Sequence, residues 1–258
     1  SSLAGKIDEW IENEGLTLYE GLLRFVSLTP LVITGHWRLS QGLDIVDPTE
    51  KYGHSGNVLH SMGFEVDFVD LRDLDAGLIL HMDDPDNPSL TQLLSSLENG
   101  EKPGEAIRKA IQTHVGPLHH GAGTNAMRMI LELRNVENLS DNLRNRIRNG
   151  ERIFGLGHRI YRTIDPRAVL LKKILQRRTE ETEHKWLPQV IEEVARGATE
   201  TILDLKDRKV FPNVDLYNAA VYSTMGFPIE FNTYLFAISR VSGWMAHTLE
   251  WYRMNPKT

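Results

Sequence analysis

Apolar side chains recur at helical spacing along almost the whole chain. Residues three, four or seven positions apart fall on one face of a helix, so each such stripe predicts an amphipathic helix that buries it. Alternation with a period of two, which is typical of strands, is nearly absent, although residues 62–69 alternate for long enough to form one short strand. The sequence therefore predicts an all-α protein. The clearest stripes are Leu18, Leu22, Phe25 and Val26; Leu90, Leu93, Leu94 and Leu97; Leu170, Leu171, Ile174 and Leu175; and Leu187, Val190, Ile191 and Val194.

Capping residues and prolines mark where helices begin and where the chain bends. The dipeptides Asn-Pro at 87–88 and Asp-Pro at 165–166 each place a capping side chain directly before a proline suited to the first turn of a helix. Two polar segments, 135–152 and 206–213, have the composition of joints. We therefore expect any second domain to be an insertion between helices.

Composition excludes several classes of protein. The 258 residues include no cysteine, which removes disulfide scaffolds, thiol nucleophiles, thiolate metal sites and iron–sulfur clusters. A net charge of −6 and a pI near 5.9 argue against a nucleic-acid-binding protein. No apolar stretch approaches the roughly 20 residues that cross a bilayer, and residues 1–20 lack a cationic, apolar leader. We expect a cytoplasmic protein that binds neither membrane nor nucleic acid.

A glycine-rich segment, GPLHHGAG at 116–123, surrounds His119 and His120 just ahead of a helical pattern. Glycine lets the backbone approach a ligand closely, and free N–H groups at the start of a helix favour anions. The alternative is an ordinary turn whose histidines cap the following helix. Spacing alone does not choose between the two.

A second segment, FGLGHRIYRTIDPR at 154–167, sets His158 against a tight glycine turn and leads into a capped helix. Between Arg144 and Arg167 the chain has seven arginines and no lysine. A run of charge is usually the solvated face of a helix, but planar guanidinium groups are what capture of carboxylate or phosphate needs. We favour an anion site here. The GLG triplet is not a dinucleotide fingerprint, because no βαβ pattern surrounds it.

A third segment, PNVDLY at 212–217, holds Asp215 between a proline and an apolar helix. Most aspartates in such a place cap the helix. A carboxylate enclosed in an apolar site near two imidazoles would instead be a candidate base. Both interpretations stay open on this segment alone.

A fourth segment, HMDDPDN at 81–87, has the carboxylates of a metal loop. Its aspartate spacing lacks the DxDxDG pattern with a distal glutamate, so we expect no metal site there. The asparagine at 87 is explained by helix capping. The histidines outside these segments are interpreted as packing or surface residues.

Taken in order, GPLHHGAG, GLGHRIYRTIDPRA, NVDLYNAAVYSTMGFP and LFAISRVSGWMAH resemble the citrate synthase family, which includes 2-methylcitrate synthase. The resemblance runs from about residue 20 to about residue 252. It implies an all-α homodimer in which each subunit has a multi-helical large domain and an inserted smaller helical domain that closes over oxaloacetate and an acyl-CoA. The large domain would comprise residues 1–120 and 222–258, and the small domain residues 121–221.

The resemblance also implies roles for three side chains. His119 corresponds to the family histidine that hydrogen-bonds the thioester oxygen, His158 to the one that polarises the ketone of oxaloacetate, and Asp215 to the base. The chemistry explains these residue types, because removing a proton from the methyl group of a thioester requires a base together with a fixed donor for the developing oxyanion. The products would be citrate and CoA, released after hydrolysis of citryl-CoA.

Further residues by motif match would hold the two substrates. Acetyl-CoA would be a cosubstrate, with no permanently bound cofactor and no metal. An acidic chain that binds polyanions needs a local cationic cluster of this kind. The implied substrate contacts are the carboxylate-binding Arg167 and Arg240, with His81 and Asp84; the implied CoA contacts are Arg162, Gly155, Leu156 and Gly157.

The chain departs from the family pattern at several positions. Asp84 stands where relatives have a histidine that contacts oxaloacetate, and an acid there repels a dicarboxylate unless it is protonated or paired. His120 and Gly123 stand where relatives have glycine and asparagine. The chain also lacks the family's long N-terminal segment and its C-terminal arginine, which would uncover apolar surface, so we predict an obligate oligomer.

The preferred hypothesis is a citrate-synthase-like acyltransferase that joins acetyl-CoA, or a related acyl-CoA, to oxaloacetate or a similar 2-oxo acid. One alternative is a catalytically impaired homologue that binds CoA or a carboxylate as a regulatory or assembly subunit. Another is a citryl-CoA lyase, since one site stabilises the same transition state in both directions.

Overall fold

The computed structural model describes residues 3–84, 87–115, 121–158 and 162–256. In these ranges the regular structure consists of α-helices and two short 3₁₀ helices, without a strand. The predicted all-α fold is confirmed. The chain divides into two compact units: unit 1 comprises residues 1–120 and 234–258, and unit 2 comprises residues 121–233.

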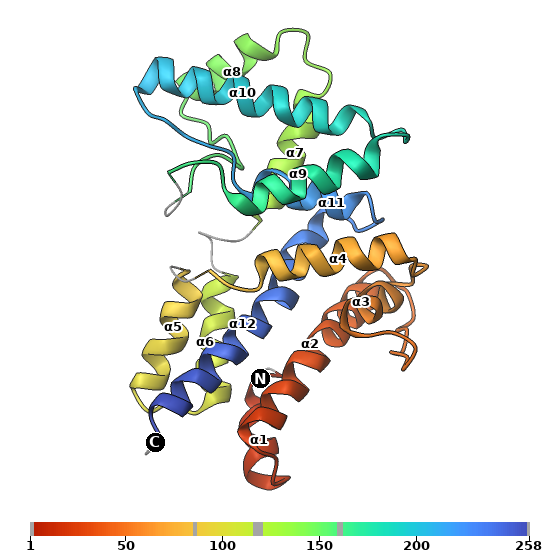
Figure 1. Cartoon of the computed structure of the whole chain (residues 1–258), viewed down its shortest axis with the longest axis vertical. Helices are drawn as coiled ribbons and strands as arrows, with labels where there is room; N and C mark the ends of the chain where they lie inside the picture. Colours follow the sequence, from red (N-terminus) through yellow and green to blue (C-terminus); the bar gives the residue numbers. More distant parts are fainter. Residues whose placement is uncertain (1–2, 85–86, 116–120, 159–161, 257–258) are drawn as a thin grey trace. The chain divides into compact units, whose positions relative to one another are not determined.

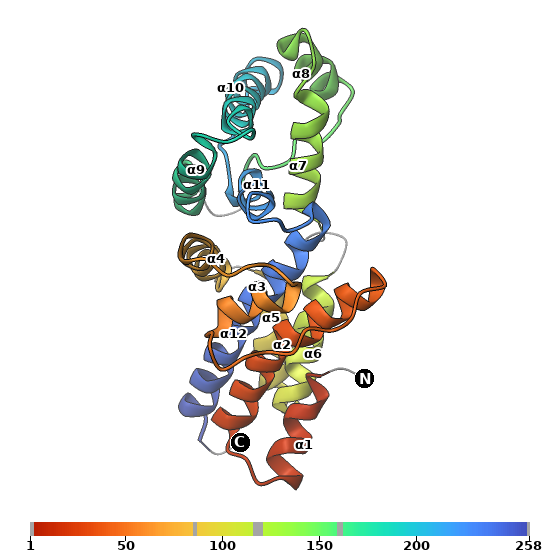
Figure 2. The ribbon, with the colours of Figure 1, turned by 90° about the vertical axis from the view of Figure 1, so that its right-hand side faces the viewer.

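Unit 1 is built around one apolar core. The helices α1, α2, α5, α6 and α12 contribute to it, and Figures 1 and 2 show α5 beside α6. Fully buried side chains such as Leu22, Leu93, Ile107 and Trp244 fill it. The helices are α1 (Gly5–Asn13), α2 (Leu18–Ser40), α3 (His54–Met62), α4 (Phe68–His81), α5 (Pro88–Glu98), α6 (Pro103–His114) and α12 (Asn232–Met254), whose first two residues belong to unit 2.

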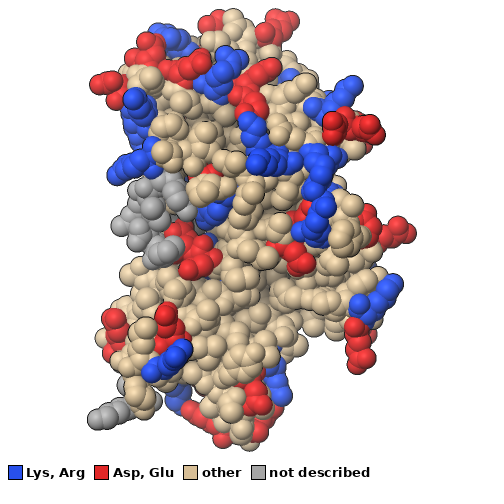
Figure 3. Space-filling model, viewed as in Figure 1, with Lys and Arg blue, Asp and Glu red and all other residues tan. Residues whose placement is uncertain are grey.

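Unit 2 has its own core, to which α7, α8, α9 and α10 contribute. Apolar residues at helical spacing meet inside it, among them Ile130, Leu171, Leu175 and Ile191, each 0% exposed. Acidic and basic side chains are interspersed on the face of this unit that Figure 3 shows. Its elements are α7 (Ala122–Leu133), α8 (Leu139–Arg148), α9 (Pro166–Thr179), α10 (Trp186–Lys206), η1 (Val214–Leu216), α11 (Asn218–Ser223) and η2 (Ile229–Phe231).

The helix starts predicted from the two proline dipeptides are confirmed. Asn87 caps α5 by accepting a hydrogen bond from the Ser89 amide at 2.9 Å, and proline occupies the first turn. Asp165 caps α9 in the same way, accepting from the Arg167 amide at 2.9 Å. Both helices therefore begin where a nearby side chain accepts a hydrogen bond from a first-turn amide, which has no carbonyl partner within the helix.

The short strand expected at 62–69 is wrong. Met62 ends α3, and Gly63 follows it with a left-handed φ of +85°. Asp67 then caps α4 by accepting from the Asp70 amide at 2.7 Å. The alternation of apolar and polar residues arises because α3 ends and α4 begins within this segment. The two capping residues, Gly63 and Asp67, lie four positions apart.

The boundary between the units lies beyond residue 221, at which the predicted small domain ends. Residues after it stay bonded to unit 2: Arg178 Nε donates to Thr224 Oγ1 at 2.7 Å, and Thr124 Oγ1 donates to the Ile229 carbonyl at 2.9 Å. Hydrogen bonds to α7 and α9 therefore keep η2 in the smaller unit. Among the described residues, no helix is long and apolar enough to cross a membrane.

Candidate active site

Two segments far apart in the sequence are joined in unit 2. The residues around the glycine turn of the second motif pair with the residues that precede η1, through an isolated antiparallel bridge between Leu156 and Pro212. The Gly157 amide donates to the Phe211 carbonyl at 2.7 Å. The segment that carries His158 is therefore fixed beside the segment that carries Asp215.

Gly155 makes this close approach possible. Its φ of +79° is a conformation that L side chains rarely adopt. A Cβ on it would lie 2.6 Å from the Cβ of Leu216, within the space that η1 occupies. Gly155 therefore packs against η1, whereas Leu156 and Gly157 line the neighbouring pocket.

Asn213 ties the two segments together with its side chain. Its Oδ1 accepts from the Asp215 amide at 3.0 Å, and its Nδ2 donates to the Gly157 carbonyl at 2.6 Å. Asn213 is therefore the cap of η1, and the interpretation of Asp215 as a capping residue is wrong. The Asp215 carboxylate is left available for another role.

The Asp215 carboxylate is partly buried and has polar neighbours. Asn218 Nδ2 donates to its Oδ1 at 3.2 Å. Burial raises the pKa of Asp215 above its usual range, which outweighs the lowering by Asn218 and by the nearby charges of Arg167 and Arg152. The negative charge of Asp165 adds to the rise in pKa. A carboxylate whose charged form is poorly solvated is a stronger proton acceptor than an exposed one, which suits a base.

His158 and Arg167 are in contact. Arg167 Nη2 lies 3.2 Å from His158 Nε2. Because a guanidinium can only donate, Nε2 must accept in this arrangement, and the ring proton then resides on Nδ1. The contact with Arg167 therefore fixes the orientation of the His158 ring.

Arg167 is itself held by Asp165. The Asp165 side chain is 0% exposed and that of Arg167 12% exposed, and Nη2 approaches Oδ2 to 2.9 Å. Burial acts to raise the pKa of Asp165, but the hydrogen bonds and charge of Arg167 hold that pKa below its usual range. The pair is therefore ionic, and it fixes the guanidinium beside His158.

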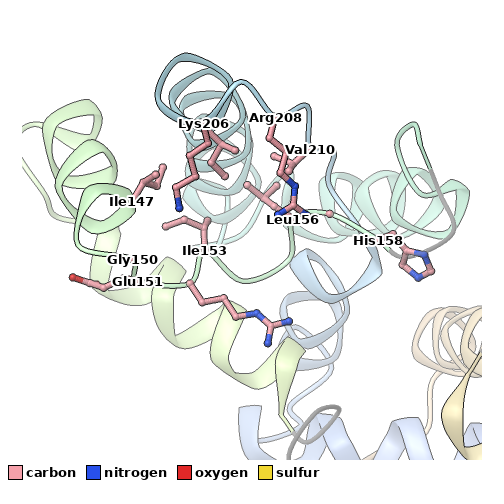
Figure 4. Close-up of a pocket in the computed structure, with 12 residues that line it drawn as sticks. Ile147, Gly150, Glu151, Ile153, Leu156, His158, Lys206, Arg208 and Val210 are labelled. Carbon is pink, nitrogen blue, oxygen red and sulfur yellow. The ribbon is translucent and has the colours of Figure 1, made fainter.

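A pocket of about 470 Å³ opens next to this cluster, lined in part by Leu156, Gly157 and His158. Lys206 and Arg208 also line it, and Figure 4 shows Lys206 directed toward Ile153 and Arg208 toward Leu156. These two cations were not singled out from the sequence. The segment 206–213 was interpreted as a joint, although its closely spaced basic residues were a signal of an anion site.

The arginines between Arg144 and Arg167 have different roles. Arg144 pairs with Asp204 at 2.6 Å, and Arg146 pairs with Glu132 at 2.9 Å, so these two form surface ion pairs between helices. Arg162 is exposed. Only part of the run therefore faces the cluster around His158.

The remaining predicted substrate residues lie in unit 1. His81 is 1% exposed, and its Nδ1 donates to the Gly77 carbonyl at 2.7 Å. Arg240, also 1% exposed, donates through Nε to the His81 carbonyl at 2.9 Å, and its guanidinium lies 4.9 Å from the centre of the Phe236 ring. Asp84 is partly exposed. Unit 1 thus brings His81 and Arg240 together.

His119, the third residue of the implied catalytic set, lies outside the described residues, as does His120. Within the described part of the chain, no group of three or more His, Asp or Glu side chains could hold a metal ion. The cluster that the structure assembles in unit 2 consists of His158, Asp165, Arg167 and Asp215.

The fold and this cluster define an all-helical protein with a partly buried carboxylate near an arginine–histidine pair. The family described as "Citrate synthase, C-terminal domain" matches residues 2–257. The chain belongs to the citrate synthase family.

Curated relatives agree with this assignment. "Citrate synthase 2" of Bacillus subtilis (strain 168) is 36% identical over 245 residues, which cover 92% of this chain and 62% of the relative. "Citrate synthase" of Acidithiobacillus ferridurans is 33% identical over 231 residues, which cover 88% of this chain and 59% of the relative. The chain spans about three fifths of the length of these relatives.

Solved structures are similar over nearly the whole chain. Citrate synthase from Pyrobaculum aerophilum aligns with a TM-score of 0.79 at 30% identity and covers 96% of this chain and 63% of its own. Citrate synthase from Thermotoga maritima MSB8 aligns with a TM-score of 0.77 at 28% identity and covers 96% of this chain and 67% of its own. The two-unit helical fold is thus that of solved citrate synthases.

Proposed function

We propose that the protein condenses acetyl-CoA, or a related acyl-CoA, with oxaloacetate or a similar 2-oxo acid and then hydrolyses the thioester. One observation carries this proposal: residues 155–158 and 165–167, paired with residues 211–215, gather a partly buried carboxylate, an imidazole and a guanidinium in unit 2. Membership of the citrate synthase family supports the same chemistry.

Asp215 acts as the base. Its carboxylate takes a proton from the carbon next to the thioester carbonyl, and the electron pair of that C–H bond moves toward the thioester oxygen as an enolate forms. Burial makes the carboxylate a stronger acceptor, and the Asn218 amide fixes its direction. His119 is the proposed donor to the enolate oxygen.

His158 activates the acceptor. Its Nδ1–H donates to the ketone oxygen of the 2-oxo acid, while Arg167 occupies Nε2. The enolate carbon bonds to the ketone carbon, and the charge that develops on the ketone oxygen is stabilised by this fixed donor. Water then cleaves the thioester of the adduct, giving the carboxylic acid product and the CoA thiol.

Arginines hold the acceptor's carboxylates in this proposal. Arg167 and Arg240 are the two proposed carboxylate-binding residues by motif match. Within its own unit each has a guanidinium fixed by a neighbouring group: Arg167 by the Asp165 carboxylate, Arg240 by the His81 carbonyl. His81 contributes by holding Arg240.

The pocket beside His158 is the proposed site for acyl-CoA. Lys206 and Arg208 supply positive charge to phosphate groups, and Leu156 with Gly157 offers backbone at the wall. Arg162, Leu156 and Gly157 remain the proposed CoA contacts by motif, whereas Gly155, which packs against η1, supports the turn that carries them. In this proposal CoA enters and leaves with each turnover.

A homodimer in the cytoplasm is part of the same proposal. Large apolar side chains of unit 1 are exposed, including Phe68 at 76% and Ile79 at 64% on α4 and Leu39 at 58% on α2. Burial of such exposed apolar side chains against a second copy would favour a dimer. Sedimentation equilibrium tests it, and a monomer at micromolar concentration would contradict it.

A thiol-release assay tests the reaction. Acetyl-CoA and propionyl-CoA are each offered with a panel of 2-oxo acids that includes oxaloacetate, and CoA thiol is measured together with the condensed acid. We expect thiol release that depends on a dicarboxylic acceptor. Release of thiol without the acceptor would show simple thioester hydrolysis and contradict the proposal.

Asp84 favours a second candidate, a homologue that binds CoA or a carboxylate without turnover. The substitution Asp84→His distinguishes the two. Improved affinity for oxaloacetate with turnover retained supports condensation with that acceptor. CoA binding by calorimetry with no thiol release from any acceptor supports the binding homologue. Cleavage of added citryl-CoA to acetyl-CoA and oxaloacetate, without release of thiol, supports the lyase direction.

A further inference from the structure

Asp165 makes more hydrogen bonds than a helix cap requires. Its Oδ1 accepts from the Arg167 amide at 2.9 Å, which is the bond that caps α9. Its Oδ2 accepts from Arg167 Nη2 at 2.9 Å and from the Val214 amide at 3.3 Å. Oδ1 therefore caps α9, and Oδ2 connects α9 to the turn before Asp215.

The backbone of Asp165 adds a third connection. Its amide donates to the Pro212 carbonyl at 3.1 Å. The residue is 0% exposed, so these bonds form where water does not compete. Asp165 is thus bonded through its backbone to Pro212 and through its side chain to Val214. Asp215 is the next residue in the chain.

We infer that Asp165 is a positioning residue for the condensation: its carboxylate fixes the Arg167 guanidinium beside His158 and holds, through the Val214 amide, the turn that presents Asp215. The inference rests on the proposed function for the meaning of these three side chains. Asp165 itself touches no reacting atom in this arrangement.

The geometry explains why a carboxylate stands here. It contacts Arg167 through Nε at 3.1 Å and through Nη2 at 2.9 Å, a side-on pairing that sets the plane of the guanidinium. The same Nη2 reaches His158 Nε2. Asp165 therefore orients the guanidinium and the imidazole together.

Two variants of Asp165 separate positioning from helix capping. Serine caps helices about as well as aspartate, so Asp165→Ser keeps the cap of α9 and removes the bonds to the guanidinium and to Val214. Asp165→Asn keeps the shape of the side chain and removes its charge. The matched control is Asp67→Ser, because Asp67 caps α4 in unit 1 and accepts from the Asp70 amide.

We expect kcat for thiol release to fall about 10- to 100-fold in both Asp165 variants, as is typical when a residue that orients a site is lost, and to stay within about 2-fold of the wild type in Asp67→Ser.

The pH profile of kcat is a measurement that a purely structural role of Asp165 would not change. In the part of the chain that the structure describes, Arg167, Arg152 and Asp165 are charged groups that act on Asp215, and of these three Asp165 raises its pKa. The acid limb of kcat should therefore move to lower pH in both variants.

Each outcome decides the inference. An Asp165→Ser protein with wild-type kcat, KM and acid limb would overturn it and leave the proposed function standing. Failure of both variants to fold, judged by circular dichroism and thermal unfolding, would assign Asp165 to stability and also overturn it. A wild-type protein that releases no thiol would overturn the proposed function first, and the inference with it.

Discussion

Asp215 shows how a single residue trades stability for chemistry. Burial raises the pKa of its carboxyl, so the folded protein holds that proton more tightly than the unfolded chain does. The favourable contribution of the proton is present at acid pH and is lost as pH rises through the pKa of the folded state. At neutral pH the ionised carboxylate therefore destabilises the fold.

Asp215→Asn should remove this cost together with the base. We expect thiol release to fall by at least about 100-fold, and the melting temperature at pH 7 to rise by about 2–4 °C. The rise should shrink as pH approaches the ordinary aspartate value of 3.8, because both proteins are then neutral at this position. Calorimetry across pH checks it, with the exposed Asp47→Asn as control, and a melting temperature below that of the wild type at pH 7 would contradict it.

Asn218 tunes the same carboxylate. Its Nδ2 stabilises the charged form of Asp215 from 3.2 Å, which lowers the pKa of that group against the effect of burial. Asn218→Ala should therefore move the acid limb of kcat to higher pH. Asn99→Ala, at an exposed asparagine of unit 1, is the control, and an unmoved acid limb in Asn218→Ala would show that this bond does not act on the base.

At the scale of elements, the glycine turn and η1 depend on each other. Gly155 and Gly150 both have a left-handed φ, of +79° and +77°, so alanine at either position costs about 1–2 kcal/mol of unfolding free energy. At Gly150 a Cβ meets nothing within 4 Å, whereas at Gly155 it lies 2.6 Å from Leu216 Cβ. Comparing the stability of alanine variants at the two positions therefore separates the effect of backbone strain from that of steric overlap.

Gly155→Ala should destabilise the protein by about 1–3 kcal/mol more than Gly150→Ala, because overlap adds to strain. It should also lower kcat, since the displaced η1 carries Asp215. Urea unfolding and the thiol-release assay measure both effects. Equal losses of unfolding free energy in the two variants would mean that η1 moves away from the added Cβ at no cost in free energy, which would contradict the prediction.

The elements themselves differ in how far local sequence predicts them. The starts of α5 and α9 follow from Asn87 and Asp165, because a cap is a contact between residues two positions apart. The alternation at 62–69 misled for the same reason: two helix ends happen to lie close together, and a period-two count cannot distinguish them from a strand.

At the scale of the whole molecule, a chain of net charge −6 concentrates cations at one pocket. An acidic protein repels a polyanion at long range, so Lys206 and Arg208 must supply a local attraction. In the face of the molecule that Figure 3 shows, charge of both signs is mixed over unit 2. The pocket's charge is thus a local feature rather than a property of the surface.

Arg208→Gln should raise the KM for acyl-CoA by about 3- to 10-fold with kcat little changed, as loss of one phosphate contact does. The effect should diminish as salt is added, because screening already weakens the contact in the wild type. Lys209→Gln is the control, since Lys209 is exposed and lies next to Arg208 without lining the pocket. Equal KM values for Arg208→Gln and the wild type at low salt would contradict the assignment of CoA to this pocket.

The sequence by itself determined the helical class, the capped helix starts and the motifs around His158 and Asp215, because each is written in the spacing of residues close together along the chain. Only the tertiary structure decided that Asn213, rather than Asp215, caps η1, that Asp165 bonds to both Arg167 and Val214, and that Lys206 and Arg208 share a pocket with Leu156. The bond of Asp165 to Val214 and the shared pocket of Lys206, Arg208 and Leu156 join residues about 50 positions apart. No local pattern specifies which of many possible partners a buried carboxylate or an exposed cation meets when the helices pack.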